Sequence, residues 1–308
     1  MLAVRIDKFG GPETLRQVEL PVPTPREGEM LVSVRAASVN PVDYKIREGK
    51  YPAVREDKLP YVLGRDLAGE VESCGPGVTG FAAGDALYAL IGIERGAYAE
   101  HVIVKPHEAA RQPRSLDRMD AAAVPLAGLT AWQGLFRHGG VEDGQRILIH
   151  GGSGGVGHFA VQFAKARGAF VATTVSTANV AFARELGADQ VIDYKTQRFE
   201  DEVRDIDMVF DLVAGETQER SWRVLRPGGI LVSTLTAPPE DKARAHQVRG
   251  MRYTVVESCA ELAEIAALID DGKVRPTVSM TFPLREAKAA QQLLEAGHVR
   301  GKVALAVG

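Results

Sequence analysis

The stretch from Ile147 to Gly157 constrains the fold of this 308-residue chain more than any other. It reads Ile-Leu-Ile-His-Gly-Gly-Ser-Gly-Gly-Val-Gly, so a short apolar run ends in seven residues of which five are glycine. Apolar residues then recur at helical spacing, at Val156, Phe159 and Phe163. This order predicts a buried strand, a tight glycine turn and a helix, the context in which a glycine motif is informative.

The glycine loop has the spacing G-x-G-x-x-G at Gly152, Gly154 and Gly157. Such glycines permit a tight turn, let the backbone approach a pyrophosphate, and let the helix pack closely on the strand. The helix N-terminus would hold the pyrophosphate with its unpaired N–H groups. We therefore predict dinucleotide binding, with a ligand-free turn as the alternative. The predicted loop contacts are Gly152, Ser153, Gly154, Gly155, Val156 and Gly157.

Composition fits a globular protein and argues against several functional classes. With 45% apolar and 25% charged residues, the chain is long enough for two domains and a large core. Its formal net charge of -3 gives no sign of a nucleic-acid partner. No apolar run approaches the roughly 18 residues of a membrane span, and the N-terminus does not read as a signal peptide. Cys74 and Cys259 form no disulfide framework, so we expect a cytoplasmic location.

Residues 1–121 are predicted to form a β-rich domain. Short segments between Gly and Pro clusters predict strands at Leu2–Ile6, Leu15–Leu20, Met30–Val39, Gly64–Val71, Asp85–Leu90 and Tyr98–Val104. Short strands with turn signals between them are typical of a barrel-like antiparallel unit. Helix-favouring, alanine-rich segments follow between Asp117 and Phe136.

Beyond Arg146 the chain alternates between strands and helices. After the glycine loop, the predicted strands are Phe170–Ser176, Gln190–Asp193, Met208–Val213, Ile230–Leu235 and Arg252–Val256. Helices are predicted at Val180–Leu186 and Thr217–Leu225, the second stopped by Pro227-Gly228-Gly229. About six strands in this alternation imply a parallel sheet with helices on both faces. Residues 122–258 are therefore predicted to be a doubly wound, Rossmann-type domain.

The last segment is predicted to return to the first domain. An amphipathic helix at Glu261–Ile269 precedes strands at Val278–Phe282 and Lys302–Val307, which flank a helix at Arg285–Leu294. About 40 residues are too few for an independent domain. Residues 259–308 should therefore complete the domain of residues 1–121, which makes the Rossmann domain an insertion in an α/β protein.

The tip of the second Rossmann strand favours NADP over NAD. NAD-selective domains carry an acidic residue about 20 positions beyond the glycines, where it binds the ribose 2′-OH. Residues 174–179 contain no carboxylate, and their hydroxyl and amide groups can donate to a 2′-phosphate. We predict Ser176 and Asn179 as phosphate contacts, with Tyr194 in support. Capping of the following helix by Ser176 is the alternative.

Six segments together resemble the medium-chain dehydrogenase/reductase superfamily, and within it the zinc-independent quinone oxidoreductases of the zeta-crystallin and enone-reductase branch. They are Asn40–Asp43, Gly64–Gly69, Leu126–Trp132, Gly151–Gly157, Arg226–Gly229 and Gly297–Lys302. The resemblance covers nearly the whole chain. It implies a GroES-like β-barrel catalytic domain with the inserted Rossmann domain, and a homodimer joined through Rossmann edge strands.

Residues at the zinc positions of the superfamily argue against a metal. Catalytic zinc needs three protein ligands drawn from Cys, His, Asp and Glu. The resemblance places Asn40, Arg65-Asp66 and Ala127 at those positions. The structural four-cysteine lobe is absent too, because residues 92–113 contain no cysteine. We therefore predict no metal, and no alcohol dehydrogenation that depends on one.

Without a metal, the substrate must already be electrophilic. Quinones and α,β-unsaturated carbonyls fit, because hydride can add to them directly while the protein orients the partners and stabilises the developing oxyanion. The resemblance places residues 40–51 beside the nicotinamide. Asn40 is predicted to bind the substrate oxygen or the cofactor, and Lys45 and Tyr51 to donate to the oxyanion. Asp43 completes the predicted catalytic set by fixing the segment, paired with Arg47 or with other neighbours; a solvated turn is the alternative.

The resemblance adds cofactor contacts outside the glycine loop. These are Thr130 near the phosphates, the backbone of Leu212-Val213 and Leu235-Thr236 near the nicotinamide ribose, and Arg300 and Lys302 in the returning segment. For the last two, ordinary charged residues before a terminal strand are the alternative.

The sequence as a whole predicts an NADPH-dependent reductase of a small electrophile, a quinone or an enone. Lysine at position 45 favours enones, because some plant enone reductases carry lysine where many quinone oxidoreductases carry tyrosine. Two alternatives stay open. One is an enoyl-thioester reductase, and the other is a non-catalytic NADPH-binding sensor protein.

Overall fold

The computed structural model describes residues 1–297 and 299–308 and divides into two compact units. His298, in the last of the six segments above, lies outside the described residues. Unit 1 comprises residues 1–126, 257–272 and 276–308; unit 2 comprises residues 127–256 and 273–275. The first division falls inside helix α3 (Pro125–Trp132), after residue 126 rather than 121, and the second after residue 256 rather than 258.

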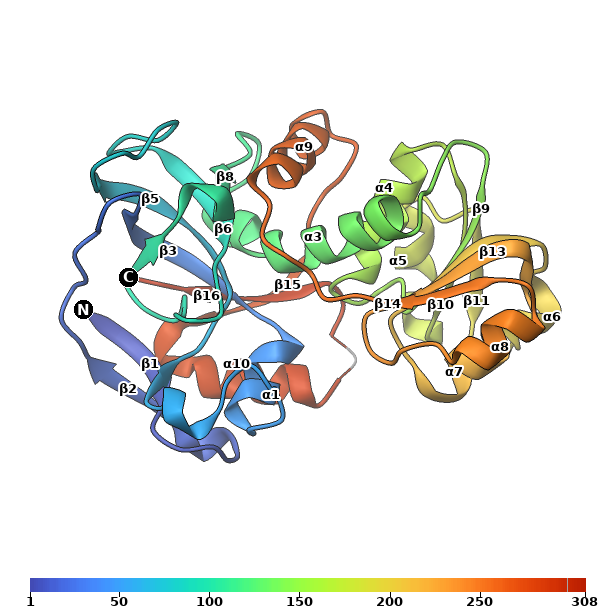
Figure 1. Ribbon diagram of the computed structural model, residues 1–308, viewed down its shortest axis with the longest axis horizontal. Coiled ribbons are helices and arrows are strands. Elements are labelled where there is room, and N and C mark those ends of the chain that lie inside the picture. Colours follow the sequence, from blue (N-terminus) through green and yellow to red (C-terminus); the bar gives the residue numbers. More distant parts are fainter. Residues whose placement is uncertain (298) are drawn as a thin grey trace. The chain divides into compact units, whose positions relative to one another are not determined.

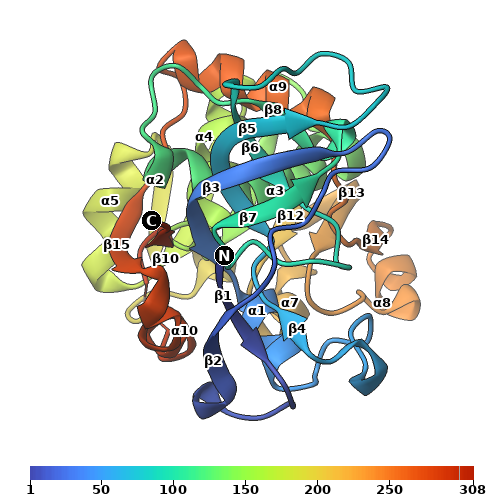
Figure 2. The same cartoon turned by 90° about the vertical axis from the view of Figure 1, so that its left-hand side faces the viewer.

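Two sheets form the framework of unit 1 (Figure 2). The larger has the order β15-β16-β3-β5-β6-β8, with β7 paired to β3, and the smaller has the order β2-β1-β4. Their strands are β1 (Leu2–Ile6), β2 (Leu15–Glu19), β3 (Met30–Val39), β4 (Tyr61–Val62), β5 (Asp66–Cys74), β6 (Ala86–Leu90), β7 (His101–Val104), β8 (Ala109–Arg111), β15 (Val278–Pro283) and β16 (Lys302–Ala306). Strand β16 pairs antiparallel with β3, so the C-terminal segment completes the first domain. The parallel pairing of β15 with β16 is the exception to the predicted antiparallel pattern.

The helices of unit 1 follow signals that the sequence carries. They are α1 (Pro41–Arg47), α2 (Arg118–Ala122), α9 (Cys259–Asp270) and α10 (Ala287–Glu295). Helix α1 begins with Pro41 in its first turn, and the Asp43 carboxylate accepts the N–H of Asn40 at 2.7 Å, which satisfies a donor at the helix start. The short loop between β3 and α1 is thereby fixed in place.

Unit 2 is built on one parallel sheet with the strand order β11-β10-β9-β12-β13-β14. Its strands are β9 (Arg146–His150), β10 (Phe170–Val175), β11 (Gln190–Asp193), β12 (Ile206–Asp211), β13 (Leu225–Ser233) and β14 (Arg249–Arg252). The side chains of residues 147–149 are fully buried at the centre of the sheet, as expected of a strand covered on both faces. The strand order is that of dinucleotide-binding folds and reverses between β9 and β12. The predicted doubly wound sheet is confirmed.

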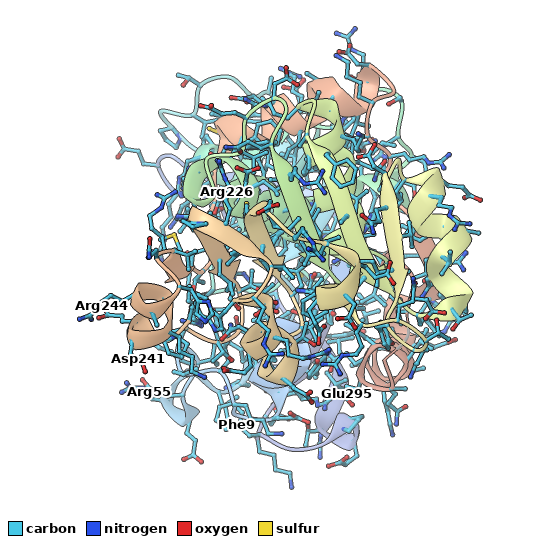
Figure 3. The ribbon with its side chains drawn as sticks, turned by 90° about the vertical axis from the view of Figure 1, so that its right-hand side faces the viewer. Phe9, Arg55, Arg226, Asp241, Arg244 and Glu295 are labelled. Carbon is cyan, nitrogen blue, oxygen red and sulfur yellow. The ribbon has the colours of Figure 1, made fainter. Side chains whose placement is uncertain are left out.

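Helices connect successive strands of unit 2 (Figure 1). They are α4 (Gly157–Ala166), α5 (Val180–Glu185), α6 (Phe199–Glu202), α7 (Gly215–Ser221) and α8 (Glu240–Ala245). Helix α4 packs on β9 and β10 and buries Phe159 and Phe163 completely, as its apolar spacing predicts. Figure 3 shows Asp241 and Arg244 projecting outward from α8. None of the helices in the described residues is long and apolar enough to cross a bilayer.

Two predicted elements of unit 2 are wrong. Helix α7 ends at Ser221, and Pro227-Gly228-Gly229 lie inside β13 rather than stopping a helix. Trp222 and Val224 are buried just beyond the helix, and these apolar residues account for the predicted extension to Leu225. The last strand is β14, not Arg252–Val256, because an exposed strand at the edge of the sheet carries little apolar signal.

Candidate functional site

The glycine loop of unit 2 is anchored to the neighbouring strand β10. The backbone N–H groups of Gly151 and Gly152 donate to Thr174 O at 3.1 and 3.3 Å, and that of Gly154 donates to Gly151 O at 3.0 Å. No side chain caps the amino end of α4, and its first turn carries no acidic residue. Within that turn the N–H of His158 donates to Gly154 O and that of Ala160 to Val156 O, both at 3.0 Å. Such a start is suited to a phosphate.

Packing within unit 2 requires glycine at two of the three motif positions but not at the third. A Cβ on Gly152 would lie 2.0 Å from Thr173 Oγ1, and one on Gly157 would lie 2.1 Å from Gly151 O. Neighbouring atoms of unit 2 therefore leave no room for a side chain at either position. A Cβ on Gly154 would meet no atom closer than Gly151 O at 3.4 Å, and its φ is outside the left-handed region. Because nothing in the fold demands glycine there, the open space fits the close approach of a pyrophosphate.

His150 supports the loop from inside the sheet, a role that sequence reasoning missed. Its ring is fully buried, with Nδ1 at 3.0 Å from Thr174 Oγ1 and Nε2 at 2.9 Å from Ser221 Oγ. Burial lowers the pKa of His150 to about 4, so the ring is neutral at physiological pH. Thr174 Oγ1 also accepts the N–H of Gly151 at 3.3 Å, which joins the ring to the loop.

The strand tip after β10 combines polar groups from two strands. Asn179 Nδ2 donates to Ser176 Oγ at 3.1 Å, and the Ser176 side chain does not cap the following 3-10 turn. The alternative role of Ser176, as a cap of the following helix, is therefore wrong, whereas its hydroxyl keeps the capacity to donate to a phosphate. Tyr194, which follows β11, is 50% exposed, and Lys195 Nζ lies 5.2 Å from its ring centroid.

A carboxylate that sequence reasoning missed lies near the tip. Asp193 is the register partner of Val175 across the β10–β11 pair. A hydrogen bond from the Thr177 hydroxyl holds the pKa of Asp193 below its usual value, and Lys195 N–H donates to Asp193 Oδ1 at 3.0 Å. The charge of this carboxylate is thus partly satisfied by groups of unit 2 itself. The register of β10 and β11 places Asp193 beside Val175. The two residues are far apart along the chain, so the sequence alone did not indicate that they are neighbours.

The remaining predicted contacts of unit 2 lie on other elements. Thr130, in α3, is 6% exposed, and its carbonyl accepts a hydrogen bond from the Tyr253 hydroxyl. The loop after β12 carries Leu212, half-buried, and Val213, 50% exposed. The loop after β13 carries Leu235, 40% exposed, and Thr236, also exposed. Both loops lie at the carboxyl edge of the sheet, the edge that carries the glycine loop.

A buried polar cluster occupies unit 1 where β3, β5 and β16 meet. Lys302 Nζ donates to Asn40 Oδ1 and lies 3.5 Å from Asp66 Oδ2. Asn40 Nδ2 and Ser38 Oγ donate to the same Asp66 oxygen at 2.8 and 2.6 Å. Asn40, Asp66 and Lys302 are at most 3% exposed. Burial lowers the pKa of Lys302, and the Asp66 carboxylate opposes that shift.

This cluster changes the predicted roles of two residues. In this structure Lys302 is an internal anchor of the Asn40 amide, and not the outward-reaching cofactor contact that the sequence predicted. Asn40 itself is 1% exposed, so its amide is oriented by Lys302 and Asp66 more than by solvent. Arg300, by contrast, is exposed, as a cofactor contact requires.

Asp43 and Arg47 do not pair with each other. Asp43 is fully buried, and its Oδ2 accepts from Asn40 N–H and, at 3.0 Å, from the Tyr98 hydroxyl. Burial raises the pKa of Asp43 to about 7. Arg47 instead binds Gln291 at 2.8 Å and Glu295. Because Asp43 has no exposed surface, its place in the catalytic set is corrected to that of a positioning residue.

Lys45 and Tyr51 differ from these buried groups. Both side chains are partly exposed, Lys45 on α1 and Tyr51 packed against the edge of the unit 1 core. They are the members of the predicted catalytic set that can reach a small molecule in this structure. The capping of α1 by Asp43 fixes the start of the helix that carries Lys45.

The residues present do not fit a zinc ion. Among residues 1–297 and 299–308, no group of three or more His, Cys, Asp or Glu side chains is placed to hold a metal. Asn40 and Asp66 occupy two of the positions that the resemblance assigns to zinc ligands, and both already contact the Lys302 ammonium. A fixed cation beside the one available carboxylate disfavours a second, divalent cation there.

Two family models match the chain. The model for the alcohol dehydrogenase GroES-like domain matches residues 26–114, and the model for zinc-binding dehydrogenase matches residues 186–305. The first match lies in unit 1, and the second spans the later strands of unit 2 and the returning segment.

Several known proteins are similar over nearly the whole chain. The zebrafish mitochondrial NAD(P)H oxidoreductase RTN4IP1 is 33% identical, over 98% of this chain and 90% of its own length. The 2-methylene-furan-3-one reductase of tomato is 35% identical, over 96% and 76%. The quinone oxidoreductase of Coxiella burnetii superposes with a TM-score of 0.93 at 38% identity, covering 100% of this chain and 99% of that one. The Escherichia coli quinone oxidoreductase in complex with NADPH superposes with a TM-score of 0.90 at 30% identity, covering 99% and 100%.

Proposed function

The chain belongs to the medium-chain dehydrogenase/reductase superfamily, in its quinone oxidoreductase branch, and on that premise we propose that it is an NADPH-dependent, zinc-independent reductase of quinones or α,β-unsaturated carbonyls. The branch makes it an NAD(P)H-dependent oxidoreductase. The choice of NADPH, the substrate class and the independence of zinc are the parts proposed here.

Two observations carry the proposal. The glycine loop has an open position at Gly154, and the tip of β10 carries the neutral side chains of Ser176 and Asn179. The loop would hold the pyrophosphate on the helix start of α4. Ser176, Asn179 and Tyr194 would contact the 2′-phosphate through hydroxyl and amide donors. The E. coli relative solved with NADPH supports this choice by likeness.

When bound, NADPH supplies a hydride from its nicotinamide ring. Lys45 and Tyr51 are proposed to donate hydrogen bonds to the substrate oxygen as negative charge develops on it. The rigid cluster of Asn40, Lys302 and Asp66 would fix the start of α1, which carries Lys45. A substrate that is already electrophilic needs no Lewis acid, which agrees with a cluster whose donors do not fit zinc.

The substrate class is proposed from two relatives. One is named for quinones and another for a 2-methylene-furan-3-one, an α,β-unsaturated ketone. Lysine at position 45 favours enones over quinones as the substrate class. An enoyl thioester is an activated alkene too, so the same chemistry extends to it.

Acceptor-dependent loss of NADPH absorbance tests the proposal. The purified protein would be assayed with para-quinones, enones and enoyl thioesters, each with and without EDTA. We expect turnover with quinones or enones that EDTA leaves unchanged. Turnover restricted to enoyl thioesters would establish the alternative reductase. NADPH binding without turnover on any acceptor would favour a sensor, and loss of activity in EDTA would refute zinc independence.

We also propose that the protein is a homodimer. Strand β14 ends the sheet of unit 2, and an edge strand presents unpaired backbone groups to a second copy. Light scattering coupled to size-exclusion chromatography would decide this, and a monomer at micromolar concentration would refute it. Location in the cytoplasm stays a prediction from composition.

A further inference from the structure

A buried carboxylate at the end of β12 receives four hydrogen bonds. Asp211 is fully buried. Its Oδ1 accepts from the backbone N–H of Val213 at 3.0 Å and of Ala214 at 2.8 Å. Its Oδ2 accepts from Gln218 Nε2 at 2.9 Å and from Ser233 Oγ at 3.0 Å. A buried charge must be satisfied by such donors, so the carboxylate and its donors form one rigid group.

Asp211 thereby joins two loops from neighbouring strands. Its Oδ1 holds the loop after β12 directly. Its Oδ2 holds the loop after β13 through two intermediates. Ser233 Oγ accepts from Leu235 N–H at 3.2 Å and Thr236 N–H at 3.4 Å. Gln218 Nε2 also donates to Thr236 O at 3.0 Å.

The first of these loops is held in a strained conformation. Ala214 has φ 65° and ψ -163°, a region that residues with a Cβ rarely adopt. The N–H of Ala214 donates to Asp211 Oδ1, which fixes the peptide group that enters this residue. Strain of this kind concentrates at ligand sites, and Val213 beside it is 50% exposed.

The position of the two loops identifies what they contact. A dinucleotide lies across the carboxyl edge of a doubly wound sheet, at the point where the strand order reverses, here between β9 and β12. The glycine loop and Ser176 take the adenosine half on the side of β9 and β10. The second nucleotide half therefore faces β12 and β13. Val213 reaches the glycine loop, because a Cβ on Gly151 would lie 3.6 Å from its Cγ2.

We propose that Asp211 is the positioning residue for the nicotinamide half of the cofactor, acting through the backbone of the loops after β12 and β13. This inference rests on the proposed NADPH-binding function. Asp211 does not touch the cofactor; it holds Val213 and Leu235, whose exposed side chains flank the nicotinamide ribose. The adenosine half is bound independently of it.

Separate titration of NADPH and adenosine 2′,5′-bisphosphate by calorimetry tests this division. Asp211→Asn keeps one oxygen for the N–H groups of Val213 and Ala214, but turns an NH2 group toward Ser233 and Gln218. We expect its NADPH dissociation constant to rise about tenfold or more, while that of the bisphosphate changes by less than about twofold. Amide hydrogen exchange of residues 234–236 should accelerate in the cofactor-free protein.

Two further variants keep the test decisive. Ser233→Ala removes one of the two links to the loop after β13 and leaves the link through Gln218. It serves if Asp211→Asn does not fold, and should show a smaller split of the same sign between the two titrants. Arg244→Ala, at an exposed position on α8, should change neither titration (Figure 3).

The outcomes separate this inference from the proposed function. The positioning role would be overturned if the Asp211 and Ser233 variants lost affinity equally for both titrants, or lost affinity for neither. The proposed function would still stand, because the wild-type protein binds both. If the wild-type protein bound neither titrant, the proposed function itself would fail.

Discussion

Replacing Gly154 by alanine should separate cofactor affinity from fold stability. A Cβ there meets no atom closer than 3.4 Å, and the backbone φ suits alanine. Alanine at a compatible position stabilises a protein by about 0.4–1 kcal/mol through the unfolded chain. The added methyl group would occupy the space of the pyrophosphate. Loss of one charge-assisted hydrogen bond costs about 1.5–3 kcal/mol, so the NADPH dissociation constant should rise about 10- to 100-fold.

Gly157→Ala is the matched control for this prediction. Its Cβ would lie 2.1 Å from Gly151 O, and overpacking of this kind costs about 1–3 kcal/mol or more. Urea denaturation and fluorescence titration of both variants make the comparison. We expect Gly154→Ala to keep or gain stability and lose affinity, and Gly157→Ala to lose stability. A Gly154→Ala protein that binds NADPH as tightly as wild type would refute the assignment of the open space to the pyrophosphate.

Four further changes test other parts of the site. Ser176→Asp places a carboxylate where the 2′-phosphate is proposed to bind, so fluorescence titration should show NADPH weakened about 10- to 100-fold more than NADH; equal loss would contradict the assignment. The pKa of Asp43 rises from 3.8 in the unfolded chain to about 7 in the folded chain, so its contribution to stability is full below 3.8 and lost as pH rises through 7. Urea denaturation should therefore show a slope of up to about 1.4 kcal/mol per pH unit in that window, absent from Asp43→Asn; identical pH profiles would count against it. Lys302→Met leaves Asp66 buried and unpaired and should cost about 3–5 kcal/mol of unfolding free energy, with partial recovery on adding Asp66→Asn; no recovery would argue against the pair. Ala214→Gly should gain about 1 kcal/mol by relieving its backbone conformation, and a loss of stability would show that no strain is present.

Local patterns were sufficient for the elements that the sequence marks clearly. Strand β3 has the predicted bounds, since ten residues between turn signals are long enough to define both ends. The glycine loop also lies where predicted, because its strand, turn and helix are adjacent in the chain. Strand β14 was misplaced because its exposed side chains carry no apolar periodicity, although its hydrogen bonds to β13 define it.

The buried polar groups of the site depended on contacts that no local pattern contains. Lys302 meets Asp66 across 236 positions of sequence, so the anchor of Asn40 could not be inferred from either segment alone. Asp193 lies beside Val175 only because β10 and β11 pair in one particular register. Asp211 carried a weak local signal, an acidic residue ending a buried strand. Such a residue must find donors, and this one finds them in two loops.

Transfer of deuterium from NADPH labelled at the transferable C4 position to an α,β-unsaturated ketone tests the central claim most directly. The account predicts that the metal-depleted protein delivers one deuterium to the β-carbon of the product, observed by mass spectrometry and NMR, at an undiminished rate. A product without deuterium, or no product while NADPH remains bound, would contradict it.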